Sequence, residues 1–237
     1  MSIASLARSV RRRVLRARYP NCINGFEAKI LSQNGEDGIL REIFRRIGTT
    51  NRFFVEFGVE TGVECNTALL SRRCGWSGLL IEGAPEKFAQ LDLNYAELPQ
   101  VQRLCAFVTR ENIAELFARS GVPEEFDLLC IDIDGNDYWV WRELHPYRPR
   151  VVVIEYNAQR KPPELWIMPY NPSHKWDGNM DLSASLASMT ELGSQLGYAL
   201  VGTESKGVNA FFVRNDVLPD SGFPARTPED AYHAYGY

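Results

Sequence analysis

The stretch Phe53-Phe54-Val55-Glu56-Phe57-Gly58-Val59-Glu60-Thr61-Gly62 decides the fold of this chain. Its apolar first half predicts a buried strand, and its two glycines predict a turn at the end of that strand. In an open parallel sheet, ligands bind outside the carboxyl ends of the strands, where glycine lets the backbone approach closely. The stretch therefore predicts the first strand of an α/β sheet and one wall of a ligand site.

The sequence after this strand continues an alternation of strands and helices. Helical patterns cover about 64–73, the residues after Pro85, the residues after Thr109, and about 138–144. Between them lie four further apolar runs: Leu79–Glu82, Val101–Val108, Asp127–Asp132 and Val151–Tyr156. Near-continuous apolar strands separated by helices indicate a parallel sheet that is covered on both faces.

The last third of the chain completes the sheet. A helix is expected near Leu182–Leu196, followed by strands at Tyr198–Gly202 and Ala210–Arg214. Because a short Ser-Lys-Gly turn joins these two strands, they must pair antiparallel. The predicted fold is α/β: a Rossmann-like, doubly wound, mostly parallel seven-stranded sheet with an antiparallel last strand and helices on both faces. No linker divides it, so residues 31–237 are expected to form one domain.

The composition limits the class of protein. The 237 residues are 45% hydrophobic and 24% charged, which excludes a disordered or collagen-like chain. No apolar run reaches the roughly 18 residues of a membrane span. The five cysteines form no CxxC pair, which disfavours a zinc ribbon or disulfide scaffold and favours a cytoplasmic location.

The charge is unevenly distributed. Residues 1–18 contain six arginines and no acid, so the net charge of -4 leaves about -10 on the rest of the chain, which disfavours nucleic-acid binding. Apolar residues recur at helical spacing in this segment, at Ile3, Leu6, Val10 and Val14. Residues 1–30 are therefore predicted to form a basic helical arm. It is either a solvated or packing helix, or it docks on an anionic membrane surface or acidic partner.

An acid on the second strand suggests the class of ligand. Glu82 follows Gly62 by 20 residues and ends the second predicted strand, where a carboxylate can accept hydrogen bonds from ribose hydroxyls. A dinucleotide site has three glycines in GxGxxG, whereas this chain offers only Gly58 and Gly62. Acids also crowd the turn, at Glu56, Glu60 and Glu64. A cationic ligand without phosphate fits this site better than a pyrophosphate.

These motifs resemble those of a known family. Glu56-x-Gly58-x-x-x-Gly62 followed by Glu82 is similar to the first two motifs of class I S-adenosylmethionine (SAM) dependent methyltransferases. The segments Ser32–Asp37 and Ile131–Gly135 resemble the FkbM-type subgroup. The resemblance spans roughly residues 30–215.

The resemblance implies a set of cofactor-binding residues. Glu56, Gly58 and Gly62 would cradle the methionine part of SAM, and Glu82 would hold the ribose. The other candidates are Asn66 and Thr67 for the SAM carboxylate, Ala106 and Phe107 near the adenine, and Asp132. Gly83 departs from the family, which often has proline there.

A second group of polar residues follows the fourth and fifth strands. It comprises Asp132, Asp134, Asn136, Asp137, Glu155 and Asn157. Crowded oxygen ligands suit a hard divalent ion such as Mg²⁺. The arrangement is similar to the branch typified by catechol O-methyltransferase, in which Asp132 and Glu155 would hold Mg²⁺; Asn157, the third candidate ligand, lies one residue later than that pattern. The alternative is that Asp132 contacts SAM or substrate directly while Asp134 and Asp137 cap the next helix.

The catalytic base and a lid complete the sequence-based hypothesis. Methyl transfer to oxygen needs a group that takes the acceptor's proton, and the candidates are Asp134 and His174. His174 lies in the proline-rich segment 157–181, which is predicted to be a substrate lid. Its aromatic residues either stack on the acceptor or hold the lid shut: Trp166, Tyr170 and Trp176.

The sequence therefore predicts a SAM-dependent O-methyltransferase acting on a hydroxyl of a small molecule, sugar or glycan, with possible help from Mg²⁺. Two alternatives stay open. One is an NAD-dependent oxidoreductase, and the other is a non-catalytic SAM-binding scaffold protein that docks through the arginine-rich helix.

Overall fold

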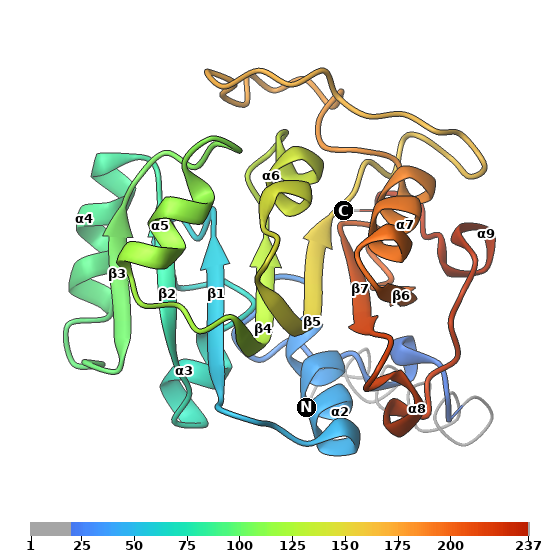
Figure 1. Ribbon diagram of the computed structural model, residues 1–237, viewed down its shortest axis with the longest axis horizontal. Helices are drawn as coiled ribbons and strands as arrows, with labels where there is room; N and C mark the ends of the chain where they lie inside the picture. Colours follow the sequence, from blue (N-terminus) through green and yellow to red (C-terminus); the bar gives the residue numbers. More distant parts are fainter. Residues whose placement is uncertain (1–19, 237) are drawn as a thin grey trace, which may run out of the picture.

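A computed structural model describes residues 20–236 of the chain (Figure 1). Its seven strands are β1 (Phe53–Phe57), β2 (Ser77–Glu82), β3 (Val101–Cys105), β4 (Glu125–Ile131), β5 (Arg148–Glu155), β6 (Tyr198–Thr203) and β7 (Asn209–Arg214). The helices of eight or more residues are α2 (Glu36–Ile47), α4 (Pro85–Asn94) and α7 (Leu186–Gln195). The shorter ones are η1 (Ile23–Phe26), α3 (Ala68–Arg73), α5 (Ile113–Arg119), α6 (Asp137–Glu143), α8 (Leu218–Ser221) and α9 (Pro228–Ala231).

The strands form one sheet in the order β3-β2-β1-β4-β5-β7-β6. The five strands from β3 to β5 are parallel to their neighbours, while β7 runs antiparallel to both β5 and β6. In Figure 1 the arrow of β7 accordingly points opposite to that of β5. This confirms the predicted seven-stranded, mostly parallel sheet and the antiparallel pairing of the last two strands.

Helices cover both faces of the sheet, each over its own hydrophobic cluster. One cluster packs α5, α6 and α7 against the sheet and includes Phe117 and Trp141. The other packs α2, α3 and α4 against the opposite face and includes Ile43 and Tyr95. Alternate residues of the central strands pack into the two clusters; for example, Val55 belongs to the first cluster and Phe54 to the second. The double coverage is therefore a consequence of strands that are apolar on both faces.

Several element boundaries differ from the predicted ones. The helix expected from about residue 64 begins at Ala68, because residues 58–67 form a loop at the tip of β1. The helix expected from Leu182 begins at Leu186, because Ala184 bridges in extended form to Ile167 and Ser185 caps the helix. Strand β7 begins at Asn209, one residue before the predicted start.

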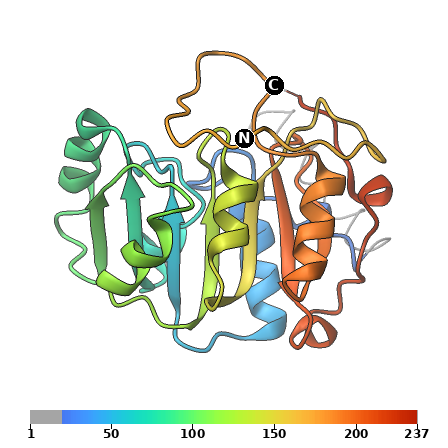
Figure 2. The ribbon, with the colours of Figure 1, turned by 45° about the horizontal axis from the view of Figure 1, so that its top comes forward.

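The segment beyond β5 crosses the carboxyl ends of the parallel strands. Figure 1 shows residues 157–181 as an orange trace above the tips of β1, β4 and β5, and Figure 2 shows the same trace from above. This is the segment predicted to be a lid.

The start of the described chain packs on the same framework. Ile23 of η1 is buried in the cluster on the α2 face, and the Glu27 carboxylate accepts a 2.7 Å hydrogen bond from the Ser205 backbone N–H. The arginine-rich helix predicted within residues 1–18 lies outside the described residues. None of the helices in residues 20–236 has the length and hydrophobicity that a membrane span requires.

Candidate functional site

The two motif glycines sit at close contacts inside the fold. At Gly58 (φ 78°), an added Cβ would lie 1.5 Å from the backbone oxygen of Asp132, because the loops after β1 and β4 cross there. At Gly62 (φ 69°), a Cβ would lie 2.5 Å from Leu91 Cδ1 and 2.6 Å from Tyr95 Cε2 of α4. Both the positive φ and these contacts require glycine. The glycines therefore fix the shape of the β1 loop before any ligand is considered.

The Glu56 carboxylate at the tip of β1 is satisfied within the chain. It accepts hydrogen bonds from Asn66 N–H (2.8 Å), Thr67 N–H (2.9 Å) and Thr67 Oγ1 (2.6 Å). Burial raises the pKa of Glu56, and these hydrogen bonds oppose that shift. The structure thus brings Glu56, Asn66 and Thr67 together. The two backbone N–H groups that the resemblance assigns to the SAM carboxylate are directed at Glu56.

Glu82 at the tip of β2 is held in the same way. Its Oε2 accepts the backbone N–H of Glu60 at 2.7 Å, and its Oε1 accepts that of Ala84 at 2.8 Å. The carboxylate therefore joins the loops that follow β1 and β2. Each oxygen keeps a further lone pair, so Glu82 can still accept hydrogen bonds from ligand hydroxyls.

The residues expected near the adenine lie beside Glu82. The Ala106 backbone N–H donates to the Glu82 carbonyl at 3.0 Å. The Phe107 side chain is 40% exposed, and a Cβ on Gly83 would approach its ring to 3.2 Å. Gly83, Ala106 and Phe107 thus form a shelf with an exposed aromatic ring next to the Glu82 carboxylate.

A cavity of about 620 Å³ opens at the carboxyl ends of the strands. This volume lies in the range of small-molecule sites, roughly 300–1,000 Å³. Its lining holds seven acids and one lysine: Glu36, Glu56, Glu60, Glu64, Asp132, Asp134, Glu155 and Lys87. The lysine is paired with Glu60 at 2.6 Å. Such a lining favours a cationic ligand and opposes a pyrophosphate.

Three carboxylates converge at the β4 and β5 side of this cavity. One oxygen each from Asp132, Asp134 and Glu155 lies within 4.8 Å of the others. Glu155 Oε2 is buried and has no hydrogen-bond partner among the described residues. Burial, with repulsion between the carboxylates as the second cause, raises the pKa values of Asp132 and Glu155 well above their ordinary values. An oxygen-only set with an orphaned buried acceptor fits a hard divalent cation such as Mg²⁺.

Asp137, at the start of α6, is not part of this group. Its two oxygens accept the backbone N–H groups of Ile133 and Gly135, each at 2.9 Å. Burial raises its pKa to about 6 despite these bonds. Asp137 thus stabilises the turn after β4, in agreement with the helix-start role considered for it. Asp134 instead lines the cavity.

Asn157, the third candidate metal ligand, is engaged elsewhere. Its Nδ2 donates to the carbonyls of Met180 (2.8 Å) and Leu182 (3.0 Å), and its Oδ1 accepts the Gln159 N–H (3.0 Å). The side chain therefore fastens the two ends of the 157–181 segment to each other. Asn157 is absent from the described lining of the cavity that contains Asp132, Asp134 and Glu155.

The 157–181 segment is attached to α6 and the loop before it. Asn136 Nδ2 donates to the Asn171 carbonyl at 2.7 Å, and Trp139 Nε1 donates to the Met168 carbonyl at 2.8 Å. His174 Nε2 lies 2.9 Å from the Asp134 backbone oxygen. His174 therefore rests on the loop that carries Asp134, although it is absent from the cavity lining among the described residues.

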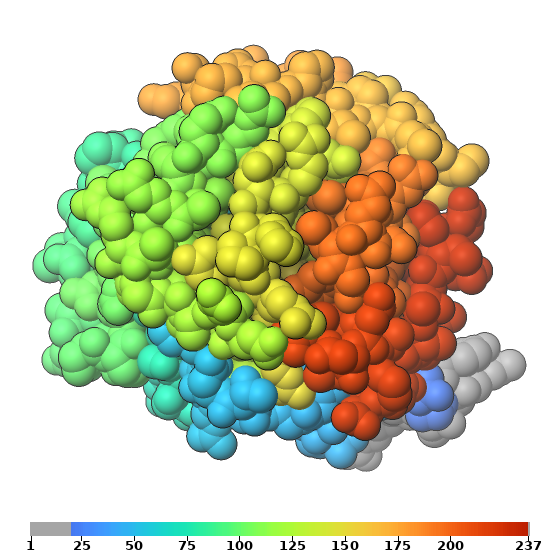
Figure 3. All heavy atoms as spheres, in the orientation of Figure 1, coloured from blue at the N-terminus to red at the C-terminus, as the bar shows by residue number. Residues whose placement is uncertain are grey.

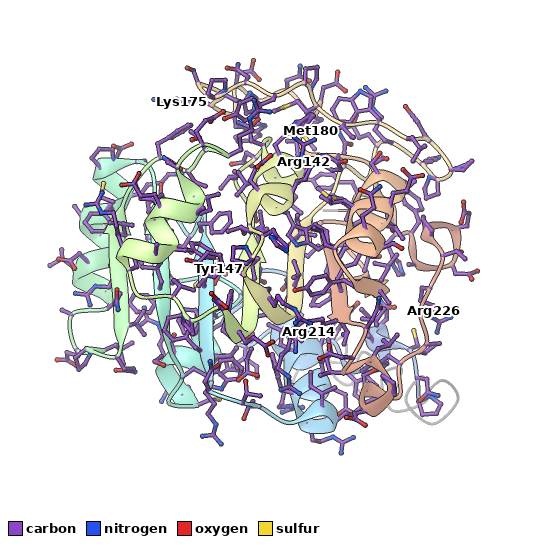
Figure 4. All side chains as sticks on the ribbon, in the orientation of Figure 1. Arg142, Tyr147, Lys175, Met180, Arg214 and Arg226 are labelled. Carbon is purple, nitrogen blue, oxygen red and sulfur yellow. The ribbon has the colours of Figure 1, made fainter. Side chains whose placement is uncertain are left out.

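The aromatic side chains of the segment divide into two groups. Trp176 lines the cavity and is 55% exposed. Trp166 and Tyr170 carry guanidinium groups over their rings, at 4.6 Å and 4.1 Å from the ring centroids. Met180 also lines the cavity, and Figure 4 labels it together with Lys175 on this segment. Figure 3 shows the segment covering the upper edge of the molecule. Of the three aromatic residues singled out from the sequence, Trp176 is the one that lines the cavity, together with Tyr235 of the C-terminal segment.

Lys87 and Asn209 are among the cavity residues that were not identified from the sequence. Lys87 lies on α4, in a charged segment with no motif around it. Asn209 stands opposite Glu155 on β7, a neighbour that only the strand order creates. The Ser-Lys-Gly turn signals the antiparallel pair of β6 and β7, but it does not reveal that β7 lies beside β5.

Comparison with solved structures identifies the fold. No family model and no curated protein sequence matches the chain. The N-terminal domain of EvdMO1 with SAH bound superposes with a TM-score of 0.51 at 14% identity, over 87% of this chain and 94% of that one. A Staphylococcus aureus protein provisionally named a caffeoyl-CoA O-methyltransferase gives 0.51 at 14% identity, over 86% and 91%. The chain has a Rossmann-like methyltransferase fold.

Proposed function

We propose that this chain is a SAM-dependent O-methyltransferase of the FkbM-like type. The observation that carries the proposal is the acid-lined cavity at the carboxyl ends of β1, β4 and β5, in a fold whose solved relative holds SAH. SAM is a sulfonium cation with an ammonium group, so seven carboxylates around one lysine suit it better than they suit NAD. The S. aureus neighbour's name adds support for oxygen as the methyl acceptor.

In this proposal the cavity and the strand tips beside it have separate tasks. Glu82 and Phe107 are outside the described cavity lining, and Glu82 adjoins it by accepting the N–H of Glu60, which is a lining residue. Glu82 accepts hydrogen bonds from the ribose hydroxyls, with Phe107 beside the adenine. The β1 loop, held in shape by Glu56, Gly58 and Gly62, surrounds the methionine part. The methyl group then points toward the carboxylates at the tips of β4 and β5, where the acceptor would lie.

Asp132, Asp134 and Glu155 would hold a divalent cation and position the acceptor. A hard cation bound there would polarise the acceptor hydroxyl and lower its pKa. Asp134 is the proposed proton acceptor, through the carboxylate oxygen that would not ligate the cation, because Asp134 lines the cavity while the His174 ring is turned to a backbone carbonyl. The acceptor oxygen forms a bond to the methyl carbon as the bond from that carbon to sulfur breaks, and the hydroxyl proton goes to Asp134.

The proposed acceptors are hydroxyl compounds of the sugar, glycan or small-molecule class. Trp176 and Met180 offer apolar surface against which such a ring can stack, and Asp134 and Glu155 offer acceptors for its hydroxyls. The test is a transfer assay with methyl-labelled SAM against a panel of hydroxylated compounds, with Mg²⁺ present. Label in the oxygen-methylated product supports the proposal, and SAM binding without transfer to any compound of this class opposes it.

A further inference from the structure

Asn209 and Glu155 face the cavity from neighbouring strands. They are directly opposed in the antiparallel pairing of β5 and β7, and both line the cavity. Side chains of directly opposed residues lie on the same face of a sheet, with Cβ atoms about 4.5–5.5 Å apart. The Asn209 amide is therefore a close neighbour of the Glu155 carboxylate.

The Asn209 amide has a defined orientation. Its Nδ2 donates to Glu36 Oε1 at 3.0 Å, and Glu36 Oε2 accepts the backbone N–H groups of Asn34 and Gly35, both at 2.8 Å. Because Glu36 accepts on both of its oxygens, the amide nitrogen must face it. The amide oxygen, Oδ1, is consequently turned away from Glu36.

This oxygen has nothing to bind within the described residues. Asn209 is 3% exposed, and its Oδ1 and Glu155 Oε2 are both buried without a hydrogen-bond partner among residues 20–236. A buried acceptor left without a donor destabilises the fold, because the group has lost its hydrogen bonds to water. Two of them on opposed residues indicate a hydrogen-bond donor or a cation that residues 20–236 do not supply.

We propose that Asn209 Oδ1 is a fourth protein ligand of the divalent cation held by Asp132, Asp134 and Glu155. The inference rests on the proposed metal site and takes the place of the Asn157 ligand expected from the sequence. A neutral amide oxygen completes a set of hard ligands without adding to the repulsion among the three carboxylates. Four protein oxygens leave positions of a six-coordinate ion open for water and an acceptor hydroxyl.

The test measures Mn²⁺ affinity by electron paramagnetic resonance, on full-length protein without SAM or acceptor. We expect Asn209→Ala to weaken Mn²⁺ binding by about ten- to hundredfold. Asn157→Ala is the matched control, because it removes an asparagine amide two residues after Glu155 that is bonded to the Met180 and Leu182 carbonyls; near-native affinity is expected. Equal weakening by both variants, or no effect of Asn209→Ala, would overturn the proposal.

A second measurement does not depend on the folding of a variant. Electron–nuclear double resonance of bound Mn²⁺ in the native-sequence protein labelled with ¹³Cγ-asparagine should show a ¹³C coupling, and Asn157→Ala should retain it. The absence of coupling overturns the proposal, and so does a failure of the protein to bind Mn²⁺. SAM binding measured in chelator separates these results from a failure of the methyltransferase assignment.

Discussion

The carboxylates at the tips of β1 and β2 differ from those at the tips of β4 and β5 in the hydrogen-bond donors that the chain supplies to them. Glu56 and Glu82 together accept five hydrogen bonds from loop backbone and Thr67. Glu155, on the other side, keeps a buried oxygen without any partner in the described chain. The first side is complete as folded, whereas the second needs a cation or a proton. One edge of the sheet thus combines carboxylates that the chain supplies with donors and a buried carboxylate oxygen that the described chain leaves without one.

The largest expected effect comes from replacing a carboxylate at the tips of β4 and β5. Glu155→Gln should lower turnover by at least about hundredfold, because a bound cation supplies several kcal/mol of transition-state stabilisation. SAM affinity, measured by calorimetry, should stay within a few-fold, because the cofactor contacts lie on other strands. Asp132→Asn should reduce both, since that strand tip lies between donor and acceptor.

The matching chemical experiment removes the metal instead of a ligand. Activity should disappear in chelator and return with Mg²⁺ or Mn²⁺, while Zn²⁺ should substitute poorly because the three converging ligands, Asp132, Asp134 and Glu155, are all carboxylates. Full activity in excess chelator would contradict the metal site and leave Asp134 or His174 as a direct general base.

The two sides should respond in opposite ways to the loss of a carboxylate. Glu56→Ala leaves two backbone N–H groups and a hydroxyl without their acceptor, so it should lower the free energy of unfolding by about 3 kcal/mol. Thr67→Val, which removes only one of the three donors, should cost about 1 kcal/mol. Glu155→Gln should not destabilise the metal-free protein, because it removes a repelled charge. Urea denaturation in chelator measures all three; a loss with Glu155→Gln as large as that with Glu56→Ala would remove the distinction.

Substitution of Glu82 tests whether the carboxylates at the tips of β1 and β2 contribute to SAM binding. Glu82→Ala should weaken SAM binding by about 1–3 kcal/mol, the usual loss for hydrogen bonds to a charged group. The Phe107→Leu variant is a useful comparison, because it alters the shelf without touching the Glu82 carboxylate. Calorimetry with SAM gives both values, and an unchanged affinity in Glu82→Ala would mean that the ribose is held elsewhere.

The pH dependence of stability sharpens the contrast further. Because the pKa of Glu155 is raised from its ordinary 4.5, the folded protein binds more protons than the unfolded chain above that pH. The free energy of unfolding of the metal-free protein should therefore fall as pH rises above the ordinary pKa of 4.5 and through the raised pKa of Glu155. Thermal melts in chelator should show this slope, and Glu155→Gln should flatten it. A stability that rises over this range in the native-sequence protein, with no change in the variant, would contradict the account.

The smallest effect concerns the 157–181 segment. Apart from the isolated bridge between Ile167 and Ala184, the described segment forms no helix or strand, so it should open more readily than the sheet when no ligand is present. Limited trypsin digestion should cut after Lys161 or Lys175, and SAM with acceptor should slow the cut. Equal protection with and without ligands would show a packed insert that does not act as a lid.

The sequence was sufficient to predict what depends on local pattern. Apolar runs with glycine turns located the strands, and the motif around Glu56 and Glu82 identified two of the residues that organise the strand tips. It could not reveal how those carboxylates are bonded, since the three donors to Glu56 lie 10 and 11 residues along a loop with no regular pattern. Nor could it reveal Asn209, which reaches Glu155 only because β7 inserts between β5 and β6. Asn157 illustrates the converse: it lies two residues after Glu155, but its amide is used by the ends of the lid segment.

Isothermal titration calorimetry of the native-sequence protein with SAM, SAH and NAD in turn tests the central claim most directly. The account predicts that SAM and SAH bind with one-to-one stoichiometry and that NAD does not bind, because the acidic cavity accepts a sulfonium and repels a pyrophosphate. Binding of NAD, without binding of SAM or SAH, would contradict it.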